Sequence, residues 1–318
     1  MAGTSIISTI GGTPAIWLDR LVEAAGVQGR ILAKLDYLNP GFSKKDRAAL
    51  GIIRAARSGG TLRPGQAVVE MTSGNMGTGL AIVCAQMGHP FIAVMSRGNS
   101  PERARMMRAL GAKVVLVEQV PGSTPGKVSG ADLARVDAVA TRLTAAHQAF
   151  RADQFAHPGN KGAHQYGTAE ELWSDSNRNV DVFVDFAGSG GTFAGTLTGL
   201  RNLNPQVRGY VVEPSGAAVL AGGDLTDPDH PIQGGGYGMP DLTQMEGIEI
   251  DGFIAVTGEE AAETTRDLAR VEGVFAGYSA GANVMAALAL LAGPETGKTI
   301  AVIICDSGLK YLSTDLWS

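Results

Sequence analysis

The chain has 318 residues, of which 44% are hydrophobic and 18% charged, a composition typical of a globular protein with a large core. The formal net charge of -5 offers no basic surface for nucleic acid. No apolar run reaches the roughly 20 residues of a membrane span, and the N-terminus lacks the pattern of a signal peptide. Cys84 and Cys305 both lie in apolar runs, so we expect buried free thiols and a cytoplasmic protein.

Short apolar strands alternate with helices along most of the chain. Such alternation predicts an α/β fold, in which parallel sheets are covered by helices. Ser100 before Pro101 and the capping box from Thr257 to Glu260 each mark a helix start. Irregular loops are expected at 121–130 and 222–240. We expect strands at 67–71, 91–96, 113–118, 180–187, 207–213 and 299–305, and helices at 77–87, 101–110, 192–202, 257–270 and 280–291.

Three polar motifs interrupt this pattern near the ends of strands or the starts of helices. The first, NPGFSKKDR at 39–47, offers a lysine amine in a tight turn. The second, EMTSGNMGTG at 70–79, opens a helix with hydroxyls and backbone N–H groups that suit a small carboxylate. The third, GSGGT at 188–192, is a glycine-rich cradle for a phosphate. Together they fit an aldehyde cofactor with a phosphate tail, pyridoxal phosphate, which needs both a Schiff-base lysine and an anion site.

Other patterns support competing interpretations. Residues 277–281 match the G-x-S-x-G nucleophile elbow, but the five histidines all precede Ser279, against the chain order of α/β-hydrolases. Residues 292–299 resemble a Walker A loop that lacks its first glycine and follows a helix. The glycine loop, with Glu213 further along, keeps a nucleotide-binding protein open as an alternative. The sequence contains no metal-ligand motif, and we expect no metal site.

The three motifs resemble those of fold-type II pyridoxal-phosphate enzymes, the cysteine synthase and cystathionine β-synthase family. The resemblance extends from residues 10–14 to residues 311–314. In the family, the corresponding turn reads N-P-x-x-S-x-K-D-R, and its Schiff-base lysine aligns with Lys45. It implies a tryptophan synthase β-like α/β fold, with two domains of parallel-type β-sheet flanked by helices, and a homodimer. The implied larger cofactor-binding domain comprises 1–40 and 149–318, and the smaller mobile domain comprises 41–148.

The resemblance also implies roles for individual residues. The glycine loop would hold the phosphate, Asn75 the ring hydroxyl, and Ser307 the pyridine nitrogen, while the loop from Thr72 and Gln154 would bind the substrate carboxylate. The implied catalytic residue is Lys45. The implied cofactor-binding residues are Lys45, Asn75, Gly188, Ser189, Gly190, Gly191, Thr192 and Ser307, and the implied substrate-binding residues are Thr72, Ser73, Gly74, Asn75, Met76, Gln154, Gly235 and Tyr237.

The expected reaction is β-replacement. A hydroxyl at the ring nitrogen makes a milder electron sink than an aspartate, which favours elimination and replacement at the β-carbon. Lys45 would take the α-proton of O-acetylserine or O-phosphoserine, and sulfide or another thiol would then replace the leaving group. Alternatives are a cystathionine β-synthase-like condensation of serine with a larger thiol, a specialised β-substituted alanine synthase, a serine or threonine dehydratase, and a non-catalytic protein.

Three departures from the family pattern leave the leaving group and the nucleophile open. Met76 replaces a threonine in the carboxylate loop, and either pocket chemistry or packing would explain the change. Cys305 replaces a proline, and we expect it to be a structural thiol. Tyr237 resembles the cystathionine β-synthase branch more than many cysteine synthases.

Overall fold

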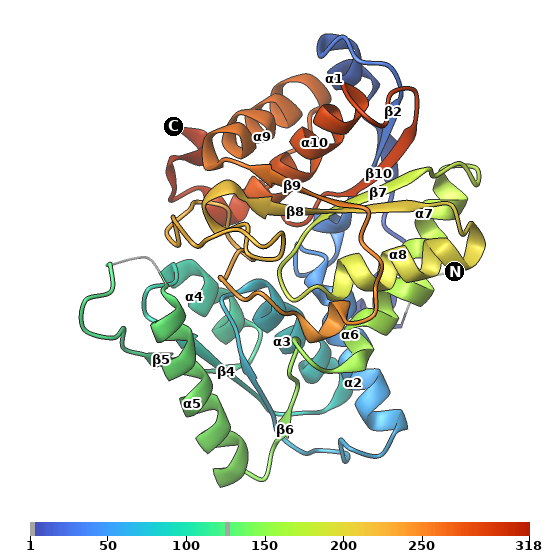
Figure 1. Cartoon of the computed structure of the whole chain (residues 1–318). Helices are drawn as coiled ribbons and strands as arrows, with labels where there is room; N and C mark the ends of the chain where they lie inside the picture. Colours follow the sequence, from blue (N-terminus) through green and yellow to red (C-terminus); the bar gives the residue numbers. More distant parts are fainter. Residues whose placement is uncertain (1–3, 125–127) are drawn as a thin grey trace.

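The computed structural model describes residues 4–124 and 128–318 (Figure 1). Residues 125–127 of the expected loop at 121–130 therefore lie outside the described part. The strands form a six-stranded sheet in the upper half of Figure 1 and a four-stranded sheet in the lower half. Helices cover both faces of each sheet, with a hydrophobic core on either side. The predicted α/β fold is confirmed.

The larger sheet is parallel except at one edge, where β1 runs antiparallel to β2. Its central strand, β7, is buried along its whole length, and its side chains alternate between two cores. Val182 and Val184 face the core shared with α1, α9 and α10, whereas Phe183 faces the core shared with α7 and α8. The strand order is β1 (Ala15–Trp17), β2 (Arg30–Lys34), β10 (Thr299–Ile303), β7 (Val182–Phe186), β8 (Arg208–Pro214) and β9 (Gly252–Val256).

The smaller sheet is parallel throughout and is covered by α2, α3 and α4 on one face and by α5 on the other. Its strand order is β5 (Lys113–Val117), β4 (Phe91–Ser96), β3 (Val68–Met71) and β6 (Phe150–Arg151). The strand β6 thus lies just beyond the expected domain boundary at 148, and the boundaries themselves stay a prediction.

The five expected helices correspond to α3, α4, α8, α9 and α10, whereas α1, α2, α5, α6 and α7 were not predicted. The Thr257–Glu260 capping box is present, whereas Ser100 takes the N-cap position without a side-chain capping bond. The helices are α1 (Asp19–Ala24), α2 (Lys45–Ser58), α3 (Asn75–Met87), α4 (Pro101–Ala109), α5 (Gly130–Ala146), α6 (Pro158–Ala163), α7 (Ala169–Asp175), α8 (Gly191–Leu203), α9 (Gly258–Glu272) and α10 (Tyr278–Leu291). A π-helix, η3 (His164–Thr168), joins α6 to α7, and short 3-10 turns occur at η1 (Ile6–Thr9), η2 (Asp36–Leu38), η4 (Ser215–Ala217), η5 (Thr243–Met245), η6 (Gly308–Tyr311) and η7 (Asp315–Trp317). Among the described helices, none combines the length and the apolar character needed to cross a bilayer.

Helix α2 links the part of the molecule that contains the six-stranded sheet, the larger half, to the part that contains the four-stranded sheet, the smaller half. It packs against α3 of the smaller half and against α6, which leads into the larger half. At the contact with α6, a methyl group added to Gly159 would lie 2.7 Å from the carbonyl oxygen of Gly51. The glycines therefore allow the two helix backbones to approach closely and fix the start of α2 at the seam between the sheets.

Candidate active site

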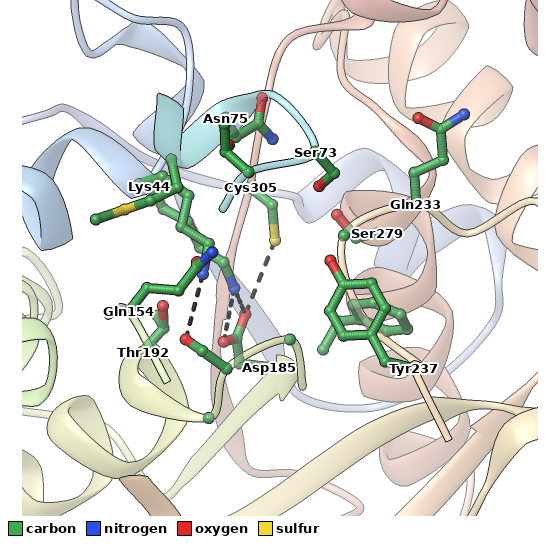
Figure 2. Close-up of a pocket in the computed structure, with 18 of the residues that line it drawn as sticks. Lys44, Ser73, Asn75, Gln154, Asp185, Thr192, Gln233, Tyr237, Ser279 and Cys305 are labelled. Atoms are coloured by element: carbon green, nitrogen blue, oxygen red, sulfur yellow. Dashed lines mark hydrogen bonds and ion pairs between the residues drawn. The ribbon is translucent and has the colours of Figure 1, made fainter. Parts of the chain in front are cut away.

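A cavity of about 730 Å³, open solvent included, lies between the two sheets (Figure 2). It is lined from the larger half by the loop after β7, the start of α10 and Cys305 after β10, and from the smaller half by the loop after β3. These segments include the carboxyl ends of parallel strands, where ligands of α/β proteins bind. The start of α2 closes one side of the cavity with two adjacent lysines.

Lys45 is the first residue of α2, and its Nζ lies 3.4 Å from Oγ of Ser189 in the glycine loop. Burial, and next the positive charge of Lys44, lower the pKa of Lys45 to about 8. An amine of this kind is partly unprotonated near neutral pH. It is therefore suited both to bond an aldehyde and to accept a proton.

Lys44 also reaches the cavity, but it is engaged in an ion pair. Its Nζ donates to both carboxylate oxygens of Asp185, at 2.7 and 2.8 Å. Burial on its own would lower the pKa of Lys44, but the attraction of Asp185 and a smaller effect of Cys305 outweigh it and raise the pKa above its ordinary value. The amine of Lys44 consequently stays a cation.

The glycine loop after β7 has the geometry of an anion site. Within the described residues no side chain caps the N-terminus of α8, so its first N–H groups point toward the loop. Gly190 has a φ of 80°, and a methyl group there would lie 2.6 Å from Met245. A methyl group on Gly188 would collide with the carbonyl oxygen of Gly234. The loop thus needs glycines to pack this closely against its neighbours. With the uncapped N-terminus of α8 in the loop and Lys45 beside it, the residues present fit pyridoxal phosphate.

Two residues behind the loop hold its hydroxyl groups. Nδ2 of Asn160 donates to Oγ of Ser189 at 3.0 Å. Nε2 of His164, in the π-helix, lies 3.2 Å from Oγ1 of Thr192, and Nδ1 lies 2.9 Å from Thr168. Burial holds the pKa of His164 well below its ordinary value, so the ring is neutral and can accept a hydrogen bond from Thr192. Neither residue was predicted, because neither belongs to a recognisable motif.

The loop after β3 forms the opposite wall. Oγ1 of Thr72 accepts hydrogen bonds from the N–H groups of Gly74 and Gly77, at 3.0 and 2.9 Å. The amide of Asn75 donates to Asp306 at 2.7 Å and accepts from Lys310 at 2.5 Å. These bonds fix the loop at the N-terminus of α3, where a carboxylate would be favoured by the helix dipole.

The far side of the cavity is closed by residues from two irregular segments. Gln154 and Phe155 lie beside Tyr237, and the rings of Phe155 and Tyr237 meet edge to face at 6.3 Å. Arg103 donates to the carbonyl oxygen of Ser73 at 2.6 Å and to the side chain of Gln233.

The cavity brings together most of the residues that the sequence suggested. Four of those suggested do not line it. Gly74 lines a smaller neighbouring cavity, Gly191 starts α8, Gly235 packs against Ala187, and Ser307 accepts the N–H of Leu309 at 3.3 Å. The suggested residues that line it are Lys45, Thr72, Ser73, Asn75, Met76, Gln154, Gly188, Ser189, Gly190, Thr192 and Tyr237.

Several lining residues were missed or were given another role. Ser279 was interpreted as part of a tight helix entry; it does lie at the start of α10, and it also faces the cavity. Cys305 is a buried free thiol as expected, but it also lies in the cavity wall, and burial raises its pKa to about 12. The other missed residues are Lys44, Arg103, Phe155, Asp185, Phe186, Phe193, Gln233, Gly234 and Tyr311.

Comparison with known proteins agrees with this geometry. The family model described as "Pyridoxal-phosphate dependent enzyme" matches residues 6–306. The chain belongs to this family. The family membership confirms the predicted resemblance, the cofactor pyridoxal phosphate and the classification as an enzyme.

Curated relatives of this pyridoxal-phosphate enzyme span nearly its whole length. An O-ureido-L-serine synthase from Streptomyces lavendulae is 38% identical over 98% of this chain and 92% of its own. A cysteine synthase from Staphylococcus aureus is 35% identical over 99% of this chain and 97% of its own. The crystal structure of O-acetyl serine sulfhydrylase isoform 3 from Entamoeba histolytica is 35% identical, with a TM-score of 0.91 over 100% of this chain and 92% of its own.

The nucleotide-binding interpretation finds no support at Glu213. The carboxylate of Glu213 accepts the N–H groups of Leu220 and Ala221, at 2.8 and 2.9 Å, and so is occupied by backbone rather than free for a ribose. The described residues contain no cluster of His, Cys, Asp and Glu that would hold a metal ion.

Proposed function

We propose that this enzyme catalyses β-replacement on an activated serine, O-acetylserine or O-phosphoserine, with sulfide or another thiol as nucleophile. The observation that carries the proposal is the position of Lys45, whose amine lies 3.4 Å from the glycine loop and has a pKa lowered to about 8. One group can therefore hold the cofactor and later accept the α-proton of the substrate. The relatives named cysteine synthase and O-ureido-L-serine synthase support this reaction class.

The residues around Lys45 would divide the work of binding. When bound, the cofactor supplies an electron sink for the charge that develops at the α-carbon. The glycine loop and the N-terminus of α8 would hold its phosphate. Thr72, Ser73 and Asn75 at the start of α3, with Gln154 opposite, would hold the substrate carboxylate and present the α-proton to Nζ of Lys45.

The nucleophile would meet the cavity wall that includes Met76 and Tyr237. Met76 and Tyr237 both line the cavity, and neither offers a charged group to select a particular acceptor. Relatives that share the fold carry names with different products, so the acceptor differs between them. Sulfide is the first choice, and a larger thiol, as in a cystathionine β-synthase-like condensation, is the alternative.

A two-step assay tests the function. The purified enzyme should be yellow, and O-acetylserine or O-phosphoserine alone should change its absorbance, with sulfide restoring the original spectrum. Lys45→Ala is the control and should show neither change. Keto acid released from serine or threonine at a rate indifferent to thiols would instead identify a dehydratase.

The expected homodimer and the cytoplasmic location stay predictions. Sedimentation of the cofactor-loaded protein would decide the first, since a dimer has twice the mass of the 32.8 kDa chain.

A further inference from the structure

Two lysine amines enter one cavity, although a single cofactor molecule can bond only one of them. Lys44 and Lys45 are adjacent in sequence at the start of α2, and both line the cavity. Sequence spacing alone does not separate them chemically, because both are primary amines on the same flexible type of side chain. The two amines differ in their hydrogen-bond partners: Lys45 lies beside the hydroxyl of Ser189, whereas Lys44 is paired with the carboxylate of Asp185.

The carboxylate of Asp185 is rigidly held. Asp185 lies one residue before the end of the buried strand β7 and is 1% exposed. Besides the two bonds from Lys44, it accepts from Nδ2 of Asn283 at 3.2 Å and lies 3.8 Å from Sγ of Cys305 (Figure 2). A buried carboxylate that accepts several hydrogen bonds keeps its partner cation in place.

Attachment of an aldehyde requires a free electron pair on nitrogen. The neutral amine adds to the aldehyde carbon, and the carbonyl oxygen then leaves as water with both amine hydrogens as the C=N bond forms. An ammonium held by a carboxylate has no such pair. We propose that Asp185 is a positioning residue that confines Lys44 to a buried ion pair and thereby directs cofactor attachment to Lys45. This proposal rests on the proposed cofactor role of Lys45.

The ion pair between Lys44 and Asp185 also affects the pKa of Lys45. The titratable groups that act on Lys45 are Lys44, Asp185, Cys305 and Glu70. After burial, the largest influence is the Lys44 cation, which lowers the pKa of Lys45. Fixing Lys44 as a cation therefore removes a competing amine and also favours the neutral form of the Lys45 amine. Replacing Asp185 should release the competing amine, because burial would then neutralise the unpaired Lys44.

The test is to locate the cofactor chemically. Enzyme loaded with pyridoxal phosphate is reduced with borohydride and digested, and the labelled peptide is sequenced by mass spectrometry. The unaltered protein should carry the label on Lys45, whereas D185N should carry a substantial share on Lys44. In a second pair, K45A should take up no covalent label and K45A/D185N should regain it on Lys44.

Two controls keep the result specific. C305A removes a weak donor from the same carboxylate and leaves the ion pair, so its label should stay on Lys45. The unaltered protein reduced at pH 9 should also be labelled on Lys45 alone, a result that does not depend on whether D185N folds.

The outcomes distinguish this inference from the proposed function. Label confined to Lys45 in folded D185N, or label on Lys44 in the unaltered protein at pH 9, would refute the role of Asp185 and leave β-replacement standing. A protein that takes up no cofactor at all would refute both.

Discussion

Lys45 is chemically unlike a lysine in water, because two neighbouring features act on its amine. Burial removes the hydration that stabilises the ammonium, and the adjacent Lys44 cation repels a second positive charge. The pKa of Lys45 is lowered to about 8 as a result. The residue thus has the property that a proton acceptor needs at neutral pH, and it acquires this property from its surroundings rather than from its own chemistry.

The first prediction concerns pH. The neutral fraction of Lys45 rises as pH rises through its pKa, so the rate of covalent cofactor uptake by the apoprotein should increase with pH, with a midpoint at about 8. Lys44→Met removes the repelling cation and should move this midpoint to higher pH. The uptake rate is followed by absorbance across a pH series. An unchanged midpoint in Lys44→Met would show that Lys44 does not influence Lys45.

The second prediction concerns Met76, which packs in the core of the smaller half and also lines the cavity. Met76→Thr should change the preference between sulfide and larger thiols while leaving the first half-reaction nearly intact, because it places a hydroxyl on the acceptor side. The substitution should also lower the free energy of unfolding by roughly 2 kcal/mol, through lost apolar burial. Rates of the two half-reactions, measured separately, check the first effect and urea unfolding checks the second.

Met95 provides the matched control for Met76. It is equally buried in the same core but does not line the cavity. Met95→Thr should therefore cost a similar amount of stability and leave the thiol preference unchanged. Equal changes of both half-reactions in Met76→Thr would assign Met76 to the geometry of the carboxylate loop instead.

At the scale of elements, the features that the sequence did predict are ones that depend on neighbours along the chain. Strand periodicity, the capping box and the glycine loop are local, and the structure confirms the elements they mark. The ion pair of Lys44 with Asp185 joins residues 141 positions apart, and Asp185 lies inside an apolar strand pattern that gives no sign of a partner. Contacts of this kind depend on how the strands are ordered in the sheet, which periodicity does not determine.

The third prediction tests the glycine loop. Gly190→Ala must place a side chain at a φ of 80° and within 2.6 Å of Met245, so cofactor affinity should fall strongly as the loop shifts. Gly297→Ala is the matched control, because Gly297 has a φ of 79° with open space around it. It should cost roughly 1–2 kcal/mol of stability from the backbone alone and leave cofactor binding intact. Equilibrium dialysis of the two variants gives the comparison; similar affinities would mean that the loop does not hold the phosphate.

At the scale of the whole molecule, the cavity draws its walls from both sheets, so its shape depends on how the two halves sit against each other. We predict that the segment 41–148 closes over the bound substrate and limits the entry of water. Hydrogen exchange with and without O-acetylserine would test this, with added protection expected in the loop after β3 and at the start of α3. Protection confined to the larger half would contradict closure.

The fifth prediction concerns stability. The N-terminus of α8 has no side-chain cap within the described residues, so an anion bound there should stabilise the folded protein. Pyridoxal phosphate at a hundredfold excess over its dissociation constant should add about 2.7 kcal/mol to the free energy of unfolding. Inorganic phosphate at millimolar concentration should give part of this effect, seen as a rise in melting temperature. Gly190→Ala should abolish the effect of inorganic phosphate, and a phosphate-induced rise of equal size in that variant would place the anion elsewhere.

The glycine contact between α2 and α6 has a consequence for how the enzyme can be observed. Gly51 and Gly159 let the two helix backbones touch, so any rocking of the smaller half is transmitted along α2 to its first residue, Lys45. Pyridoxal phosphate attached to Lys45 would then report on the contact between α2 and α6. Its absorbance and fluorescence would change when helices move that do not themselves contact the cofactor. A methyl group at Gly159, which pushes α2 outward, should therefore alter the colour of the enzyme before it alters its fold.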